Sequence, residues 1–257
     1  MKILIIGDII GNIGVKRVKE IIPQYKNQNN IDFIIANGEN SADGMGINLK
    51  IFEELKKAGV NVVTMGNHTW GKKDIFSFID DEQIIRPANY SKGIPGKGYS
   101  IYKCNNKKIA VINLIGRVDI SVLSENPFLT VEDIIEKIKN EADAIIVDFH
   151  AEATAEKIAM GYFLDGKVTC VYGTHTHVQT ADETILENGT AYITDIGMTG
   201  PIKSVIGMDI DVSLKRFVST LPERYKISSD KNVSINGIIL EIDDETCRTK
   251  KIERVKM

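Results

Sequence analysis

The four histidines of this chain all follow short apolar segments, and this placement is the first indication of chemistry. They are His68, His150, His175 and His177. Oxygen-bearing side chains take the same position after other apolar segments, and these are Asp8, Glu39, Asn40 and Asn67. Imidazole nitrogen together with carboxylate or amide oxygen suits a pair of small divalent or trivalent metal ions. The sequence therefore predicts a metal centre.

Each of these residues also has a plainer explanation. The two histidines of Gly173-Thr174-His175-Thr176-His177 could be exposed on a loop, and a single histidine such as His150 after a strand is often structural. Asp8 could cap a turn. We favour metal ligation for all of them because they share one position relative to the predicted strands.

Three apolar segments in the first part of the chain predict buried strands at residues 2–7, 32–36 and 61–65. Helical periodicity lies between them, so the order is βαβαβ, which predicts a parallel sheet with right-handed crossovers. Functional sites of such sheets lie outside the carboxyl ends of the strands. Asp8, Glu39 and His68 with their neighbours lie at those ends.

The first predicted helix covers residues 15–25, after a turn at 11–14, and Pro23 should kink or end it. The second should stop at Gly59, a glycine C-cap. Further predicted elements are a hairpin of 99–104 and 108–114, a helix from 130 to about 140, a strand at 144–149, a helix at 152–164, a strand at 168–172, a helix near 211–218 and a last strand pair of 235–242 and 248–255. These hairpins predict a second, mostly antiparallel sheet within one domain, residues 1–257.

Composition excludes several classes of function. Lys and Arg number 32 against 35 Asp and Glu, and this net charge of −3 argues against a protein that acts mainly by binding nucleic-acid backbones. The three cysteines are widely spaced without a Cys-x-x-Cys pair, as expected for reduced thiols in a cytoplasmic protein. No apolar segment approaches the ~20 residues that cross a bilayer.

Gly66-Asn67-His68 followed by Gly-x-His-x-His is similar to the pattern of calcineurin-like metallophosphoesterases. The whole chain to about Leu240 resembles one branch of that superfamily, the YmdB-type bacterial phosphodiesterases. The segments that carry the resemblance are 7–11 (Gly-Asp-Ile-Ile-Gly), 36–40 (Ala-Asn-Gly-Glu-Asn), 66–70 (Gly-Asn-His-Thr-Trp), 86–90 (Arg-Pro-Ala-Asn-Tyr) and 197–201 (Gly-Met-Thr-Gly-Pro).

The resemblance implies an α/β fold, a four-layer α/β/β/α sandwich of two mixed sheets of the metallophosphoesterase type. It also implies two metal ions, iron and/or manganese, and hydrolysis of small nucleotide phosphodiesters, foremost 2′,3′-cyclic nucleotides, by metal-bridged hydroxide. Glu39 would bridge the ions. The remaining ligands implied are Asp8, Asn40 and His177 for one ion and Asn67, His150 and His175 for the other.

His68 would lie beside the ions as the proton donor to the leaving oxygen, because imidazole exchanges protons near neutral pH. Relatives usually end the first strand with Asp-x-His, whereas Ile10 stands here at the histidine position and cannot bind a metal. Asn40 is the expected replacement. An amide oxygen is a harder ligand than an imidazole nitrogen. The metal bound by those relatives is therefore a weak guide to the metal of this protein.

Several alternatives stay open at the level of the sequence. The chain could be a phosphomonoesterase or 5′-nucleotidase, or a regulatory scaffold that binds an RNA-processing partner, and it could form a homo-oligomer. Arg86 and Arg117 are secondary candidates for holding phosphate. The 116–130 segment could cross the site or contact another subunit, and the 197–201 loop could close over substrate or be an ordinary turn.

Overall fold

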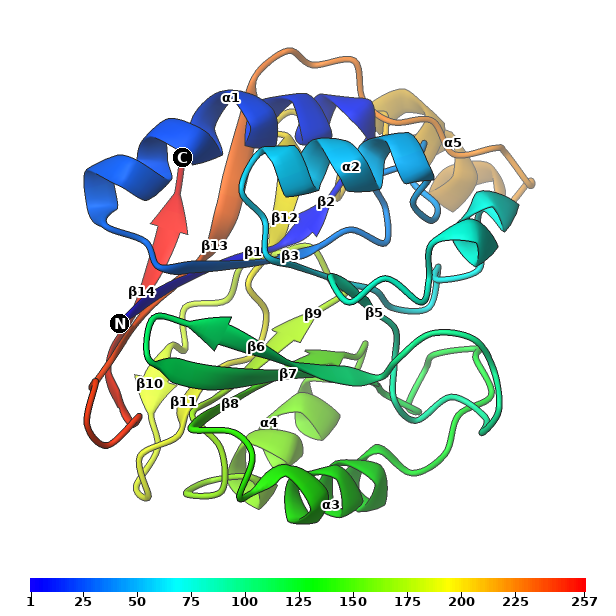
Figure 1. Ribbon diagram of the computed structural model, residues 1–257. Coiled ribbons are helices and arrows are strands. Elements are labelled where there is room, and N and C mark those ends of the chain that lie inside the picture. The colour runs from blue at the N-terminus through cyan, green and yellow to red at the C-terminus, as the bar shows by residue number, and fades with distance from the viewer.

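The computed structural model describes residues 1–257 and contains two mixed β-sheets and five α-helices. The helices are α1 (Gly11–Asn29), α2 (Leu49–Lys57), α3 (Pro127–Ile138), α4 (Thr154–Phe163) and α5 (Ile210–Ser219). Figure 1 shows α1 and α2 above one sheet, the second sheet beneath it, and α3 and α4 at the bottom. The predicted four-layer α/β/β/α sandwich is confirmed.

The first sheet has eight strands, in the order β2-β12-β13-β1-β3-β4-β5, with β14 paired to β13. Its members are β1 (Lys2–Ile6), β2 (Asp8–Ile9), β3 (Phe33–Asn37), β4 (Val62–Thr64), β5 (Ile84–Ile85), β12 (Met198–Pro201), β13 (Val233–Ile242) and β14 (Thr249–Lys256). The strands β1, β3, β4 and β5 are parallel neighbours, as the βαβαβ pattern predicts. The last predicted strand pair, β13 and β14, extends this same sheet.

The second sheet has six strands in the order β10-β11-β9-β8-β7-β6. They are β6 (Tyr99–Cys104), β7 (Lys107–Ile115), β8 (Ala144–His150), β9 (Cys170–Thr174), β10 (Thr184–Ile185) and β11 (Ala191–Ile193). The prediction of a mostly antiparallel sheet is wrong: β7, β8, β9 and β11 are parallel, and antiparallel pairs occur only at the two edges. Helical crossovers such as α4, between β8 and β9, produce parallel neighbours.

The strand β1 shows why such apolar segments lie in the middle of the sandwich. Ile3 and Ile5 belong to the core between the two sheets. Leu4 and Ile6 belong to the core between the first sheet and its helices. Successive side chains of a strand point to opposite faces, so a strand covered on both faces must be apolar throughout.

Two helix boundaries differ from the predictions for local reasons. The helix α1 begins at Gly11, not Val15, and continues through Pro23 to Asn29. Pro23 is exposed, so the carbonyl group that loses its helical partner there can bind water instead. The predicted C-cap is confirmed, since Gly59 follows α2 with a φ of 99°, a conformation that glycine adopts without strain.

The 197–201 segment is not a loop over the site. Its residues 198–201 form β12, which pairs with β2 and β13, and most of them are buried. The carboxyl ends of β1, β3 and β9 lie on the side of the molecule where α5 is found (Figure 1). None of the helices is both long and apolar enough to span a bilayer.

Candidate metal centre

The side chains predicted to form the metal centre come together at the carboxyl ends of the parallel strands of both sheets. The first sheet supplies Asp8 just after β1, Glu39 and Asn40 after β3, and Asn67 and His68 after β4. The second sheet supplies His150, the last residue of β8, and His175 and His177 after β9. Because the two sheets face each other, residues far apart in the chain meet in one layer.

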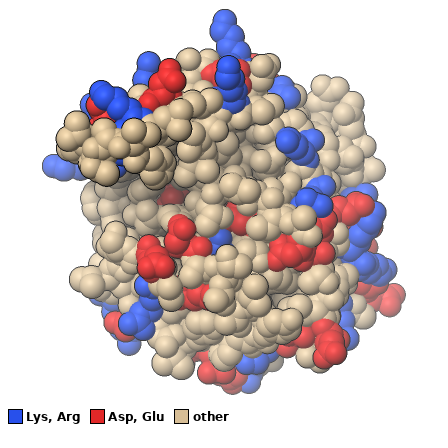
Figure 2. Space-filling model, turned by 180° about the vertical axis from the view of Figure 1, so that it is seen from behind, with Lys and Arg blue, Asp and Glu red and all other residues tan.

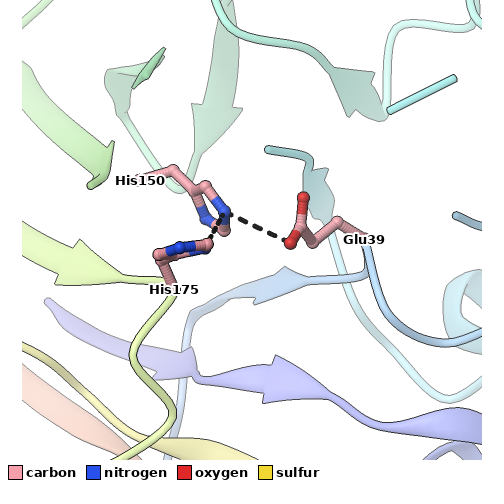
Figure 3. A group of neighbouring side chains, drawn as sticks. All are labelled: Glu39, His150 and His175. Carbon is pink, nitrogen blue, oxygen red and sulfur yellow. Dashed lines mark hydrogen bonds and ion pairs between the residues drawn. The ribbon is translucent and has the colours of Figure 1, made fainter. Parts of the chain in front are cut away.

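The closest group of potential ligand atoms surrounds Nε2 of His150. This atom lies 2.8 Å from Oδ1 of Asn67, 3.0 Å from Nδ1 of His175 and 3.2 Å from Oε1 of Glu39. The ligand atoms of Glu39, His150 and His175 all lie within 4.8 Å of one another. Figure 3 shows these three side chains turned toward a common point.

The hydrogen bonds of His150 leave its Nε2 available to this group. Its Nδ1 lies 2.9 Å from the hydroxyl oxygen of Thr174. That hydroxyl group donates its only hydrogen to the carboxylate of Asp148 at 2.7 Å, so it must accept from His150. In the neutral ring Nε2 therefore carries a lone pair.

The other two histidines are held in the same manner. Nε2 of His175 lies 3.0 Å from the carboxylate of Glu152, and its Nδ1 lies 3.0 Å from Nε2 of His150. Nδ1 of His177 donates to the carbonyl oxygen of Ile206 at 2.9 Å, which leaves Nε2 free. One nitrogen fixed by an acceptor and the other facing inward is the usual arrangement of histidines that bind metals.

A second group of potential ligand atoms contains Asp8, Asn40 and His177. Asp8 is fully buried, and its Oδ1 has no hydrogen-bond partner and lies 3.8 Å from Nε2 of His177. The amide nitrogen of Asn40 lies 3.2 Å from that Nε2, while its oxygen lies 2.7 Å from Nδ1 of His68. To present its oxygen to an ion beside His177, the Asn40 amide must turn over.

The charges of the site favour a cation at its centre. Burial alone would raise the pKa of Glu39, but the charge of His150 and the hydrogen bonds from His150 and His68 lower it to about 2. Burial opposes a charge on His150, yet Glu39 and Asp8 raise its pKa to about 9. Burial and the nearby His150 lower the pKa of His175 to about 3, so that ring keeps its lone pair.

The donor set and the shape of the site fit a metal centre. Buried imidazole and carboxylate groups face one another, and a metal ion can take the place of the proton that Glu39 and Asp8 otherwise draw onto His150. Gly66 leaves room for this arrangement, because a Cβ atom there would lie 2.4 Å from Nε2 of His150 and 2.5 Å from Oε2 of Glu39. No larger residue can take this position without displacing a ligand.

The sequence reasoning missed the residues that hold the histidines. Glu152 follows His150 by two positions at the same strand end, so its placement was a signal that went unused. Thr176 lies between two histidines with φ values of 98° and 66°, and its N–H and hydroxyl both donate to Asp195. Asp195 is itself buried and paired with buried Lys157 at 2.7 Å. Nothing in the local sequence marks that pair.

Neither of the two arginines suggested as phosphate holders reaches the cavity over the metal centre. Arg86 is buried and donates to the carbonyl oxygens of Pro87, Ile94 and Pro95, so it shapes a loop. The cavity over the metal centre is lined by neither Arg86 nor Arg117. The prediction for Arg86 is therefore wrong, because its guanidinium group is occupied by backbone acceptors.

Comparison with known proteins gives one consistent family. The family model described as YmdB-like protein matches residues 4–255. The 2′,3′-cyclic-nucleotide 2′-phosphodiesterase of Bacillus subtilis is 48% identical over 99% of this chain and 96% of its own. The structure of a novel phosphatase from Mycoplasma pneumoniae has a TM-score of 0.94 at 38% identity, over 100% of this chain and 93% of its own. A putative 5′-nucleotidase of Staphylococcus aureus shares the fold, with a TM-score of 0.63 at 14% identity over 99% of this chain and 54% of its own.

The space at Gly66 provides a direct test of the metal centre. Gly66→Ala should lower the affinity for Mn²⁺ at least tenfold, because the new methyl group displaces His150 or Glu39. Calorimetric titration of the metal-stripped protein measures this affinity, and circular dichroism checks the fold. Gly93→Ala is the control for metal affinity, since nothing lies within 4 Å of its added Cβ. Its φ of 83° strains an alanine, so this variant is compared by affinity and not by stability. Equal affinities for the two variants would contradict the placement of the ligands.

The hydroxyl of Thr174 provides a second test. Thr174→Val removes the acceptor of the His150 Nδ1–H, so we expect a roughly 10- to 100-fold loss of metal affinity, typical when a supporting hydrogen bond of a ligand is removed. Thr174→Ser keeps the hydroxyl and should retain most of the affinity. If valine and serine behave alike in the same titration, the hydroxyl does not set the orientation of His150.

Proposed function

The chain belongs to the YmdB-like protein family, and from this premise we propose that it hydrolyses small nucleotide phosphodiesters, foremost 2′,3′-cyclic nucleotides such as 2′,3′-cAMP. It is a phosphoric ester hydrolase, as its relatives are named. One observation supports the proposal above the others. Three histidines from one sheet each have one nitrogen within 3.0 Å of an oxygen acceptor and the other on the side of the buried carboxylates of the facing sheet.

We propose that this centre holds two metal ions, iron and/or manganese. Glu39 would serve both, because its oxygen Oε1 lies within 3.2 Å of His150 Nε2 and within 3.3 Å of the Asn40 amide. The remaining ligands would be Asn67, His150 and His175 for one ion and Asp8, Asn40 and His177 for the other. Such a pair of ions supplies an activated water at neutral pH and neutralises charge on the phosphoryl oxygens.

His68 is placed to supply a proton to the leaving oxygen. Its Nδ1 lies 2.7 Å from the Asn40 amide oxygen and 3.5 Å from Glu39, so Glu39 stays beside the ring if that oxygen turns to an ion. Its Nε2 has no hydrogen-bond partner in the protein. The side chain is 30% exposed and lines the cavity. In its protonated form the ring could give its Nε2 proton to a ribose oxygen.

The cavity over the metal centre measures about 750 Å³, which is large enough for a mononucleotide. The comparisons give no support to a regulatory scaffold. We propose one domain, residues 1–257, working in the cytoplasm, where its three buried free cysteines would stay reduced. An RNA-processing partner and a homo-oligomer remain predictions from the sequence.

A substrate panel tests the proposed function. The Mn²⁺- or Fe-loaded protein should hydrolyse 2′,3′-cAMP and 2′,3′-cGMP much faster than 3′-AMP or 5′-AMP, measured as kcat/KM by chromatography of the products. Metal removal by a chelator should abolish the activity, and Mn²⁺ should restore it. Faster hydrolysis of the monoesters would instead establish the phosphomonoesterase alternative.

The role of His68 is tested by changing the leaving group. A ribose hydroxyl needs a proton to depart, whereas nitrophenolate does not. His68→Ala should therefore lose roughly 10²- to 10⁴-fold in kcat on 2′,3′-cAMP, the usual range for general acid catalysis, and far less on bis-nitrophenyl phosphate. Elemental analysis must show unchanged metal content. Equal losses on both substrates would assign His68 to positioning instead.

A further inference from the structure

The cavity over the metal centre has an apolar wall that contains none of the proposed ligands and that the chemistry at phosphorus does not use. This wall comes from α5 and the segments on either side of it, and its apolar members are Val205, Ile206, Met208, Phe217, Tyr225 and Ile227. Phe217 is 73% exposed and Tyr225 49% exposed. Two large rings this open to solvent, beside a catalytic cavity, indicate a surface that binds a flat apolar group.

Figure 2 shows this part of the molecule from behind. The region of α5 is the overhanging lobe at the upper left, and much of its surface is tan, without charged residues. The molecule is hollowed beneath the lobe, and acidic atoms are visible inside the hollow. A largely apolar overhang therefore faces an acidic floor.

The wall is attached to the metal centre through Ile206. Its carbonyl oxygen accepts the hydrogen bond from Nδ1 of His177, so only one imidazole ring separates it from the ligand atom Nε2. Ile206 and Gly207, with φ values of 47° and 99°, form the two-residue turn between Val205 and Met208. A β-branched residue at positive φ is strained, and such strain is found where a side chain must occupy a functional position.

The ring of Tyr225 is held in place before any ligand binds. The guanidinium group of Arg216 lies over the ring, 4.1 Å from its centroid. Arg216 also donates to the carbonyl oxygen of Glu223, and the Glu223 carboxylate is paired with Lys215, so two residues of α5 fix the segment before Tyr225. Arg216 covers one face of the ring, which leaves the opposite face for a ligand.

We propose that Ile206, Phe217 and Tyr225 form a nucleobase-binding wall, on which the base of the substrate stacks while its phosphate lies at the metal centre. This inference rests on the proposed function. It assigns a binding surface to the base, which is the part of the nucleotide that does not take part in the hydrolysis. In a 2′,3′-cyclic nucleotide the phosphate and the base are joined to the same ribose, so the base must lie about one sugar width from the ions. The wall lines the same cavity as His175 and His177, and it adjoins them at Ile206.

The chemistry of the wall also predicts its selectivity. Stacking on an aromatic ring accepts any base, and preferences follow the strength of stacking. The three wall residues offer apolar surface and only one polar atom, the tyrosine hydroxyl. The enzyme should therefore prefer purine to pyrimidine 2′,3′-cyclic nucleotides and should distinguish adenine from guanine only weakly.

The test compares a substrate that has a base with one that lacks it. We would measure kcat/KM and KM for 2′,3′-cAMP and for 1-O-methylribose 2′,3′-cyclic phosphate with the metal-loaded protein. Tyr225→Ala should raise the KM for 2′,3′-cAMP roughly 5- to 100-fold, the range for loss of one base–aromatic stack, and should affect the base-free ester far less. Tyr225→Phe keeps the ring and should stay close to the unsubstituted protein.

Tyr162 on α4 supplies the matched control, since it is 69% exposed and does not line the cavity. Tyr162→Ala should leave the hydrolysis of both substrates unaffected.

Equal losses on the two substrates in Tyr225→Ala, or no loss on either, would overturn the proposed wall. If the unsubstituted protein cleaves neither ester, the proposed function fails, and calorimetry then gives Kd for uncleaved 2′,3′-cAMP. A Kd raised in Tyr225→Ala supports the wall even then, and an unchanged Kd overturns it.

Discussion

The buried carboxylate of Glu39 is the group on which the site depends. It is 1% exposed, and removing a charge from water costs several kcal/mol unless partners compensate. The compensation comes from both sheets: His68 N–H donates to Oε2 from the first sheet, and His150 Nε2 approaches Oε1 from the second. The carboxyl ends of two sheets that are far apart in sequence must therefore stay in register around one side chain.

Other buried polar groups keep this register. Thr64 of β4 donates to Asp148 of β8, so a hydrogen bond crosses between the sheets directly beneath the site. Further along, the Asp195 carboxylate holds both the turn at Thr176 and the N–H of Gly197, and Lys157 balances its charge. The centre of the sandwich is apolar, whereas this end is a connected polar layer. The apolar part supplies stability, and the polar part sets the positions of the proposed ligands.

Much of the site was predictable from the sequence because the ends of buried strands can be predicted from it. A continuous apolar segment marks a buried strand, and parallel strands bring the residues after them to one edge, so Asp8, Glu39 and His150 could be placed together. The supporting groups could not be predicted in this way. The pairing of Lys157 with Asp195, and the position of Tyr225 over the cavity, depend on contacts between segments that carry no shared local pattern. The parallel core of the second sheet was missed because hairpins at its edges dominated the pattern.

The most direct test of the account is the metal content of the unsubstituted protein and of Glu39→Gln, which keeps the volume of the side chain but removes its charge. Both proteins would be loaded with Mn²⁺, dialysed and measured by elemental analysis per chain. The account predicts two equivalents for the unsubstituted protein and loss of both ions in Glu39→Gln, because one carboxylate serves both. In Asn40→Ala, measured alongside them, one ion should be lost more than the other. Two equivalents retained by Glu39→Gln would contradict the central role of Glu39.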